Sequence, residues 1–210
     1  MKNILLFGDS NTYGVDIVNG GRLERNERFT GILQSLLKDD FYIIEEGLNG
    51  RTTVFTDPIG ENRNGIAAIE MVLQTHIPLD LVTIMLGTND TKAHFSASAA
   101  VIAKGIRNIC RKILNYDYSP GTVPKILIVS PIHIGWNIEE CPFPDFDSTS
   151  YEKSLQLSKE YLKIAEELNC YFFDAASVAE PSPIDQIHLD VSGHKSLAIA
   201  LENKIKSIFS

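Results

Sequence analysis

Short apolar runs alternate with longer amphipathic segments along the whole chain. A short run that is apolar on consecutive residues predicts a strand buried on both faces, and apolar residues recurring three or four positions apart predict a helix. The predicted strands are Ile4–Phe7, Tyr42–Ile44, Leu81–Leu86, Ile126–Val129 and Tyr171–Phe173. The predicted helices are Phe29–Lys38, Ile66–Leu73, Val101–Leu114, Tyr151–Leu168 and Ser192–Ile208.

This alternation predicts an α/β fold in which helices cover both faces of a central parallel sheet of about five strands. A chain of 210 residues is enough for one sizeable core, so we expect a single domain over residues 1–210. Binding sites in such sheets form at the carboxyl ends of the strands. Two long loops, Asp16–Glu27 and Ile132–Ser148, join the elements. The second is rich in aromatic residues and proline, which is typical of a lid, a pocket wall, a subunit contact or a surface loop with packed anchors.

Three residues suited to nucleophilic catalysis lie at the ends of predicted elements. Ser10 follows the first strand, and Asp185 and His188 precede the last helix. A serine hydroxyl needs a base to accept its proton, and an imidazole serves best when a carboxylate fixes its tautomer. Ser10 alone would equally suit the N-cap of a helix. With the other two residues present, the sequence favours Ser10 as nucleophile, His188 as base and Asp185 as its partner.

Other candidates for these roles are weaker. Asp190 follows the histidine, which makes it a poorer partner for His188 than Asp185 is. His194 falls on the last predicted helix, where we expect it to be packed or to cap. The Gly-x-Ser-x-Gly elbow of the α/β-hydrolase fold does not surround Ser10.

Acyl transfer also needs hydrogen-bond donors fixed around the oxyanion of the tetrahedral intermediate. Two glycine-containing loops, Gly47–Thr53 and Gly87–Asp90, follow the second and third predicted strands. Candidate donors are a backbone N–H of the first loop, the side-chain amide of Asn89 and the backbone N–H of Ser10. Read separately, both loops carry only ordinary turn signals.

Composition and charge narrow the class of protein. A formal net charge of -8 argues against nucleic acid as a partner, because phosphates would be repelled. Three widely spaced cysteines, Cys110, Cys141 and Cys170, indicate reduced thiols and a cytoplasmic protein. No cysteine or histidine cluster has the spacing of a zinc site, so we expect no metal. No apolar run is long enough to span a membrane, so we expect no membrane insertion.

Four ordered blocks resemble the SGNH (GDSL) hydrolase family. They are Gly8-Asp9-Ser10, Gly50, Gly87-x-Asn89-Asp90 and Asp185-x-x-His188, and the similarity extends over residues 4 to 198. The resemblance implies a flavodoxin-like three-layer α/β/α sandwich and the triad Ser10, Asp185 and His188. It implies an oxyanion hole from the N–H groups of Ser10 and Gly50 and the side chain of Asn89. It also implies hydrolysis of carboxylic esters without a cofactor.

Two longer runs, Ile44–Thr53 and Pro78–Lys92, are similar to the arylesterase/acyltransferase branch of this family, which contains a mycobacterial acyltransferase. That similarity implies short acyl-ester substrates, acyl transfer to alcohols and a homo-oligomer, with an octamer as the expected form. The chain departs from the branch after the serine, where Asn11-Thr12-Tyr13-Gly14-Val15 replaces larger apolar or tryptophan side chains. We predict that Asn11, Tyr13 and Trp136 shape the substrate pocket, with core packing as the alternative for Tyr13 and Trp136.

Two other functions remain open on the sequence. The first is a carbohydrate O-acetylesterase, in which the aromatic loop containing Trp136, Phe143 and Phe146 would stack on sugars. The second is a flavodoxin-like binding module without catalysis, in which Ser10 would cap a helix and bind an anion. We expect Asp9 and Asp90 to tie the site loops together, with Arg51 and Lys92 paired to them or solvated.

Overall fold

A computed structural model describes all 210 residues of the chain. Its strands are β1 (Lys2–Gly8), β2 (Phe41–Gly47), β3 (Leu81–Met85), β4 (Lys125–Ser130) and β5 (Tyr171–Asp174). They form one parallel sheet in the order β2-β1-β3-β4-β5. This is the flavodoxin-like order, with the switch point between β1 and β3. The predicted α/β fold and its five parallel strands are confirmed.

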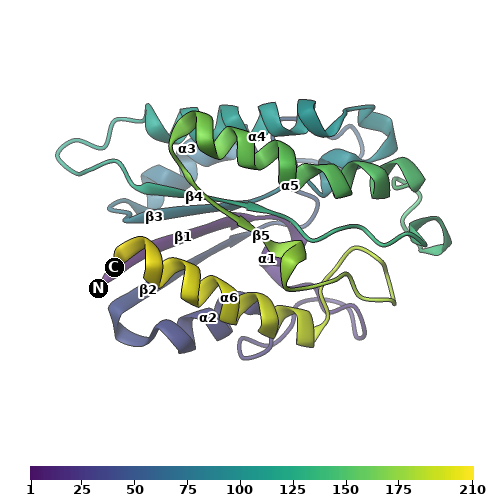
Figure 1. Cartoon of the computed structure of the whole chain (residues 1–210), viewed down its shortest axis with the longest axis horizontal. Coiled ribbons are helices and arrows are strands. Elements are labelled where there is room, and N and C mark those ends of the chain that lie inside the picture. The colour runs from purple at the N-terminus through teal and green to yellow at the C-terminus, as the bar shows by residue number, and fades with distance from the viewer.

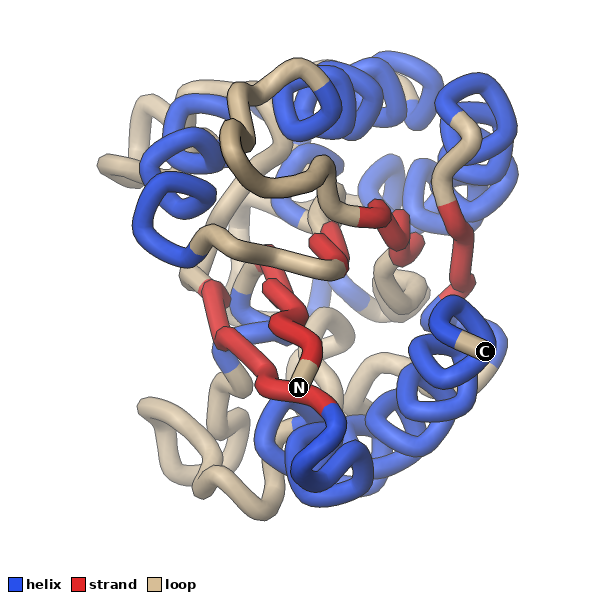
Figure 2. Tube along the Cα trace, turned by 90° about the vertical axis from the view of Figure 1, so that its left-hand side faces the viewer, coloured by secondary structure: helices blue, strands red, loops and turns tan.

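Helices cover both faces of the sheet. They are α1 (Ser10–Tyr13), α2 (Phe29–Leu37), α3 (Gly65–His76), α4 (Ala99–Leu114), α5 (Ser148–Leu168) and α6 (Val191–Phe209). In Figure 1, α3, α4 and α5 lie on one side of the strands, and α2 and α6 lie on the other. Figure 2 shows the same three layers from the side, with the strands between two groups of helices. None of these helices combines the length and the apolar composition that a membrane span requires.

The side chains of each strand divide between two cores. In β1, Leu5 and Phe7 belong to the apolar cluster formed with α3, α4 and α5, whereas Ile4 and Leu6 belong to the cluster formed with α2 and α6. All four side chains are at most 1% exposed. An unbroken apolar run is therefore what a strand between two helical layers requires.

Several element boundaries lie a few residues from the sequence prediction, and at two of them polar residues extend the element. β2 continues past Ile44 to Gly47, where its residues still pair with β1, and Glu45 forms ion pairs with arginines that precede α2, including Arg28 at 2.8 Å. α5 begins at Ser148, because Asp147 and Ser150 form a capping box at its start. Neither extension carries the apolar periodicity from which the boundaries were predicted.

The loop from residue 131 to 147 has a small core of its own. Ile134, Ile138 and Phe146 form a third buried cluster together with Ile187, which lies in the segment before α6. A short 3₁₀ helix, Ile138–Glu140, lies inside the loop. The loop is thus packed against the segment that carries His188.

We predict that Gly47→Ala is strongly destabilising, because the end of β2 closely approaches the backbone of α1. A methyl group at Gly47 would lie 2.1 Å from the Tyr13 backbone nitrogen. We expect the free energy of unfolding to fall by about 2 kcal/mol or more, measured by urea denaturation. The control is Gly20→Ala, where no atom lies within 4 Å and only the positive φ of 78° opposes alanine. An equal loss in the two variants would contradict the argument.

Candidate active site

The turn between β1 and α1 presents Ser10 at the carboxyl end of the sheet. Ser10 is the first residue of α1, and Asp9 is the N-cap, accepting a hydrogen bond from the Asn11 N–H at 3.0 Å. Asp9, and not Ser10, therefore caps the helix. The alternative role of Ser10 as the N-cap is thus wrong. The Ser10 hydroxyl is left to interact with other groups.

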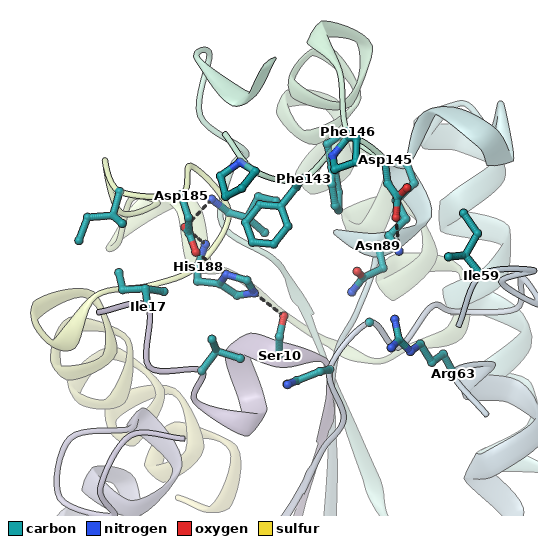
Figure 3. Close-up of a pocket in the computed structure, with 18 of the residues that line it drawn as sticks. Ser10, Ile17, Ile59, Arg63, Asn89, Phe143, Asp145, Phe146, Asp185 and His188 are labelled. Carbon is teal, nitrogen blue, oxygen red and sulfur yellow. Dashed lines mark hydrogen bonds and ion pairs between the residues drawn. The ribbon is translucent and has the colours of Figure 1, made fainter. Parts of the chain in front are cut away.

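Ser10, His188 and Asp185 form a continuous hydrogen-bonded chain (Figure 3). His188 Nε2 lies 2.8 Å from Ser10 Oγ, and His188 Nδ1 lies 2.6 Å from Asp185 Oδ2. A carboxylate accepts but does not donate, so the proton on the imidazole is assigned to Nδ1. Nε2 then accepts the hydrogen bond from Ser10, which is the arrangement a general base needs.

The turn from Asp185 to His188 is fixed by the same carboxylate. Asp185 Oδ1 accepts hydrogen bonds from the backbone N–H groups of Ile187 at 3.1 Å and His188 at 2.9 Å. Burial opposes ionisation of Asp185, but its hydrogen bonds and the neighbouring His188 hold its pKa below the ordinary value. Asp185 thus stays ionised while it orients the imidazole.

Asn11 holds the histidine from the other side. Its Nδ2 donates to the Ile187 carbonyl at 3.3 Å, and its Oδ1 accepts from the Leu189 N–H at 2.9 Å. Asn11 therefore bonds the backbone on both sides of His188. The residue that follows the serine ties α1 to a segment more than 170 positions away along the chain.

A cavity of about 690 Å³ opens above Ser10 and His188. Its walls come from the loops that follow β1, β2 and β3, from the 131–147 loop and from the segment before α6. The lining residues are Ser10, Val15, Asp16, Ile17, Asn49, Gly50, Ile59, Arg63, Asn89, Lys92, Pro142, Phe143, Pro144, Asp145, Phe146, Ile184, Asp185, Ile187 and His188. In Figure 3, Ser10 and His188 lie on one side of this cavity, and Asn89 and Arg63 lie on the other.

Gly50 and Asn89, the two residues expected beside Ser10, line the same cavity. Gly50 has a φ of 77°, a conformation that glycine adopts without steric penalty. Asn89 Nδ2 donates to the Arg51 carbonyl at 3.2 Å, which fixes the amide group in place. Because an amide nitrogen carries two hydrogens, one remains for a group bound in the cavity.

Two buried carboxylates lie beneath the cavity. Asp90 accepts hydrogen bonds from the Thr53 N–H at 2.9 and 3.0 Å, and so links the loops after β2 and β3. Burial raises the pKa of Asp90 to about 7 and the pKa of Asp9 to about 6. The expectation that these residues tie the site loops together is confirmed for Asp90, which bonds Thr53. It is wrong for Asp9, whose carboxylate bonds only the Asn11 N–H of its own turn and so caps the helix that carries Ser10.

Arg51 and Lys92 do not pair with these carboxylates, contrary to one of the two expectations. Arg51 donates to the carbonyls of Gly8 and Glu46, and its guanidinium lies 4.2 Å from the centre of the Phe7 ring. It thereby joins the ends of β1 and β2. The second expectation, solvation, is also wrong, because Arg51 and Lys92 are each 5% exposed.

Lys92 joins three loops through a buried ion-pair cluster. Its ammonium lies 3.0 Å from Asp57 Oδ2 and 3.3 Å from Asp145 Oδ2, and the Asp57 side chain is fully buried. Burial opposes ionisation of Asp57, but the Ile59 N–H and Lys92 hold its pKa below the ordinary value. Asp145 belongs to the 131–147 loop, so Lys92 holds the aromatic wall of the cavity against the loop after β3.

Three residues predicted to shape the pocket do not line it. The Asn11 amide is used to hold the His188 segment, the Tyr13 ring lies 4.7 Å from the Arg22 guanidinium, and Trp136 is 74% exposed. His194 is packed as predicted: it is 1% exposed, and its Nδ1 accepts a hydrogen bond from the Phe29 N–H. Burial lowers the pKa of His194 to about 4, which keeps this acceptor nitrogen unprotonated.

The sequence did not indicate that Arg63 lines the cavity or that Phe143 lies beside His188. The Phe143 ring meets the His188 ring edge-on, with the centroids 6.0 Å apart. The aromatic content of its loop was the only signal for it. Arg63 lies in a polar stretch without periodicity or motif, so nothing in the sequence distinguishes it. Nowhere in the structure do three or more His, Cys, Asp or Glu side chains gather in a way that could hold a metal ion.

We predict that Lys92→Met lowers the free energy of unfolding by about 3 kcal/mol or more, because it leaves Asp57 buried without its cation. The double variant Lys92→Met/Asp57→Asn should recover much of this loss, since the fully buried carboxylate of Asp57 is gone and the Asp145 side chain, 31% exposed, stays in contact with solvent. Urea denaturation of both variants at neutral pH tests the prediction. A double variant no more stable than the single one would show that charge pairing is not the cause.

We predict that Asp90→Asn reduces the pH dependence of stability. The pKa of Asp90 is raised from 3.8 to about 7 by burial, so the folded state holds a proton that the unfolded state has released. Its contribution to stability is present below about pH 4 and is lost as the pH rises through about 7. Urea denaturation from pH 4.5 to 7.5 should therefore show a smaller fall in the variant. The exposed Asp39→Asn variant should keep the wild-type dependence, and an Asp90→Asn profile equal to that of wild type would contradict the prediction.

The family comparison agrees with this geometry. Residues 6–195 match the model of the GDSL-like Lipase/Acylhydrolase family. No curated protein sequence matches the chain.

Similar solved structures extend over almost the whole chain. The M. smegmatis aryl esterase is 37% identical with a TM-score of 0.91, covering 99% of each chain. A carbohydrate acetylesterase family member from Sinorhizobium meliloti is 37% identical with a TM-score of 0.92, also covering 99% of each chain. A carbohydrate acetylesterase from the same organism is 36% identical with a TM-score of 0.92, covering 100% of each chain. With the matching family model and this level of identity, the chain belongs to the GDSL-like lipase/acylhydrolase family.

Proposed function

We propose that this protein is a serine esterase that hydrolyses short-chain, acetyl-like carboxylic esters through an acyl-enzyme on Ser10. The observation that carries the proposal is the hydrogen-bonded chain from Ser10 through His188 to Asp185 at the wall of an open cavity. A buried, oriented imidazole in contact with a serine hydroxyl is the requirement for activating that hydroxyl as a nucleophile. Similarity to the M. smegmatis aryl esterase supports the choice of ester bonds.

In the first half of the reaction, Ser10 Oγ attacks the ester carbonyl while His188 Nε2 accepts the hydroxyl proton. Asp185 stabilises the imidazolium that forms. The negative charge on the former carbonyl oxygen is met by the N–H groups of Ser10 and Gly50 and the Asn89 amide. Donors of this kind are worth about 3–4 kcal/mol each in the transition state. When the tetrahedral intermediate collapses, the C–O bond to the alcohol breaks and His188 gives its proton to the leaving oxygen.

In the second half, a water molecule takes the place of the alcohol. His188 accepts a proton from the water, whose oxygen attacks the acyl carbon, and the acid is released as Ser10 regains its proton. An alcohol in the place of water would give acyl transfer. The apolar side chains of Ile17, Phe143 and Ile187 in the cavity wall support binding of an alcohol there.

We further propose that residues 1–210 act as one domain in a cytoplasmic homo-oligomer, of which an octamer is one form. Apolar residues at the cavity support a covering subunit: Ile59 and Ile184 line it and are 71% and 58% exposed. A neighbouring copy seated on these side chains would narrow the entrance and favour short acyl groups.

A carbohydrate O-acetylesterase is the second candidate. It is favoured by the similarity to the two carbohydrate acetylesterase structures from Sinorhizobium meliloti. The chemistry at Ser10 would be the same, and only the alcohol would differ. The exposed Trp136 ring offers an apolar face to a sugar outside the cavity.

Initial rates on p-nitrophenyl esters from acetate to octanoate, with Ser10→Ala beside wild type, test the proposal. We expect the rate to fall steeply with chain length and to drop by about 10³-fold or more in the variant. Acetate release from acetylated sugars at the same enzyme concentration separates the two candidates. Equal activity of Ser10→Ala and wild type would overturn both.

A further inference from the structure

Arg63 differs from the other arginines in having no partner within the protein. Of the seven arginines in the chain, five pair with glutamate side chains and Arg51 donates to backbone carbonyls. The guanidinium of Arg63 makes no ion pair and no hydrogen bond, although it is only partly exposed. Its five N–H donors are therefore available to a bound molecule.

This free guanidinium lies inside the cavity that holds Ser10. Figure 3 shows Arg63 below Asn89, directed into the cavity from the side opposite His188. It packs over two glycines: a methyl group at Gly50 would lie 2.4 Å from its Nη1, and one at Gly60 would lie 2.7 Å from its Nε. The absence of side chains at these positions makes room for the guanidinium next to the oxyanion-hole loop.

The backbone of Arg63 is held firmly. Its carbonyl accepts a hydrogen bond from the Thr52 N–H at 2.9 Å, and the next residue, Asn64, pairs with Thr52 in a β-bridge. Asn64 is also the N-cap of α3, accepting from the Ala67 N–H. The Arg63 side chain therefore extends from a fixed backbone. Because the loop is already ordered, binding of a ligand to Arg63 costs little conformational entropy in the loop.

The other charged groups in the cavity wall already have partners. Lys92 is neutralised by Asp57 and Asp145, and Asp185 is paired with His188. Asp16 accepts hydrogen bonds from the backbone of its own turn, at residues 18 and 19. Arg63 is thus the one charged side chain of the cavity whose hydrogen-bonding groups are entirely unused.

A second cavity adjoins the first at Arg63. It has a volume of about 600 Å³, and most of its lining residues are polar, among them Thr56, Glu61 and Asn64. Arg63 lines both cavities. A group bound by the guanidinium would therefore lie where the two cavities meet.

We propose that Arg63 is a specificity-determining residue, and that its guanidinium binds a carboxylate carried by the ester substrate. This inference rests on the proposed esterase function and adds the substrate class, an anionic ester. A guanidinium binds a carboxylate through two parallel hydrogen bonds, which neither an alcohol nor an amide group can form with it. In a protein of net charge -8, an anionic substrate needs such a local cation at the site.

Two pairs of esters test whether the carboxylate lies on the alcohol or on the acyl group. The first pair is 4-acetoxybenzoate and the neutral 4-acetoxybenzamide. The second is 4-nitrophenyl hydrogen glutarate and its neutral monoamide, with spontaneous hydrolysis subtracted. The quantity compared is the ratio of kcat/KM for the anionic ester to that for its neutral partner. This ratio cancels any general damage to the oxyanion hole caused by a substitution at Arg63.

In Arg63→Gln we expect this ratio to fall at least about tenfold in one pair, which identifies the side of the ester that carries the carboxylate. Arg63→Lys should keep part of the preference, because it keeps the charge but loses the two parallel hydrogen bonds. The matched control is Arg111→Gln, which removes the same charge from an exposed pair with Glu167 and should keep the wild-type ratio. A wild-type ratio in Arg63→Gln for both pairs would overturn the proposal.

A binding measurement tests carboxylate recognition by Arg63 separately from the proposed esterase activity. Calorimetric titration of 4-acetoxybenzoate and of the glutarate ester into Ser10→Ala should give a Kd at least about tenfold tighter than into Ser10→Ala/Arg63→Gln for one of them. If no Ser10-dependent hydrolysis is found but the difference in Kd persists, the proposed esterase function is wrong and carboxylate binding at Arg63 is supported. Equal Kd values for both esters in the two variants would overturn the proposal about Arg63, whatever the activity.

Discussion

The parallel pairing of β1 with β2 on one side and β3 on the other is the constraint from which the site follows. In the register of these strands, Gly8 lies opposite Gly47 and Met85, so all three strands end at the same level. Ser10, Gly50 and Asn89 each come within four residues of a strand end. Parallel strands must deliver their carboxyl ends to one edge, and three polar groups from distant parts of the sequence therefore meet there.

The histidine reaches this edge by a different route. His188 does not follow a strand, and its place depends on contacts with segments far away in sequence. Asn11 bonds the backbone on both sides of it, and Ile187 packs into the apolar cluster of the 131–147 loop. That loop is in turn fixed to the rest of the site by the ion pair between Asp145 and Lys92. Packing and polar contacts thus act together to keep Nε2 within hydrogen-bonding distance of Ser10.

Buried ionisable side chains connect the loops of the site. Asp90, Arg51 and Lys92 are each at most 5% exposed, and each connects segments that follow different strands. Removing charges from water is unfavourable unless hydrogen bonds or opposite charges replace the lost solvation. Here Thr53, the carbonyls of Gly8 and Glu46, and the carboxylates around Lys92 supply that replacement. The buried polar groups give these loops one arrangement, which a reaction requiring fixed donors needs.

The architecture and the contact between Asp185 and His188 could be anticipated from the sequence because both depend on local signals. The apolar runs set which segments are strands, and the spacing of Asp185 and His188 is that of a tight turn in which the carboxylate reaches the ring. Element ends were less accurate where charged residues extended the element, as at Glu45 and Ser148. The local apolar pattern around Glu45 does not indicate an ion-pair partner such as Arg28, which lies in another segment.

The sequence by itself determined a parallel α/β sheet and candidates for a nucleophile, a base and an acid at element ends, because these follow from short-range patterns. Only the tertiary structure decided which side chains face the cavity. Asn11 turns to the His188 backbone and Trp136 to solvent, while Arg63 and Phe143 enter the cavity. The direction of a loop side chain is set by packing between segments distant along the chain, and no periodicity within the loop encodes it.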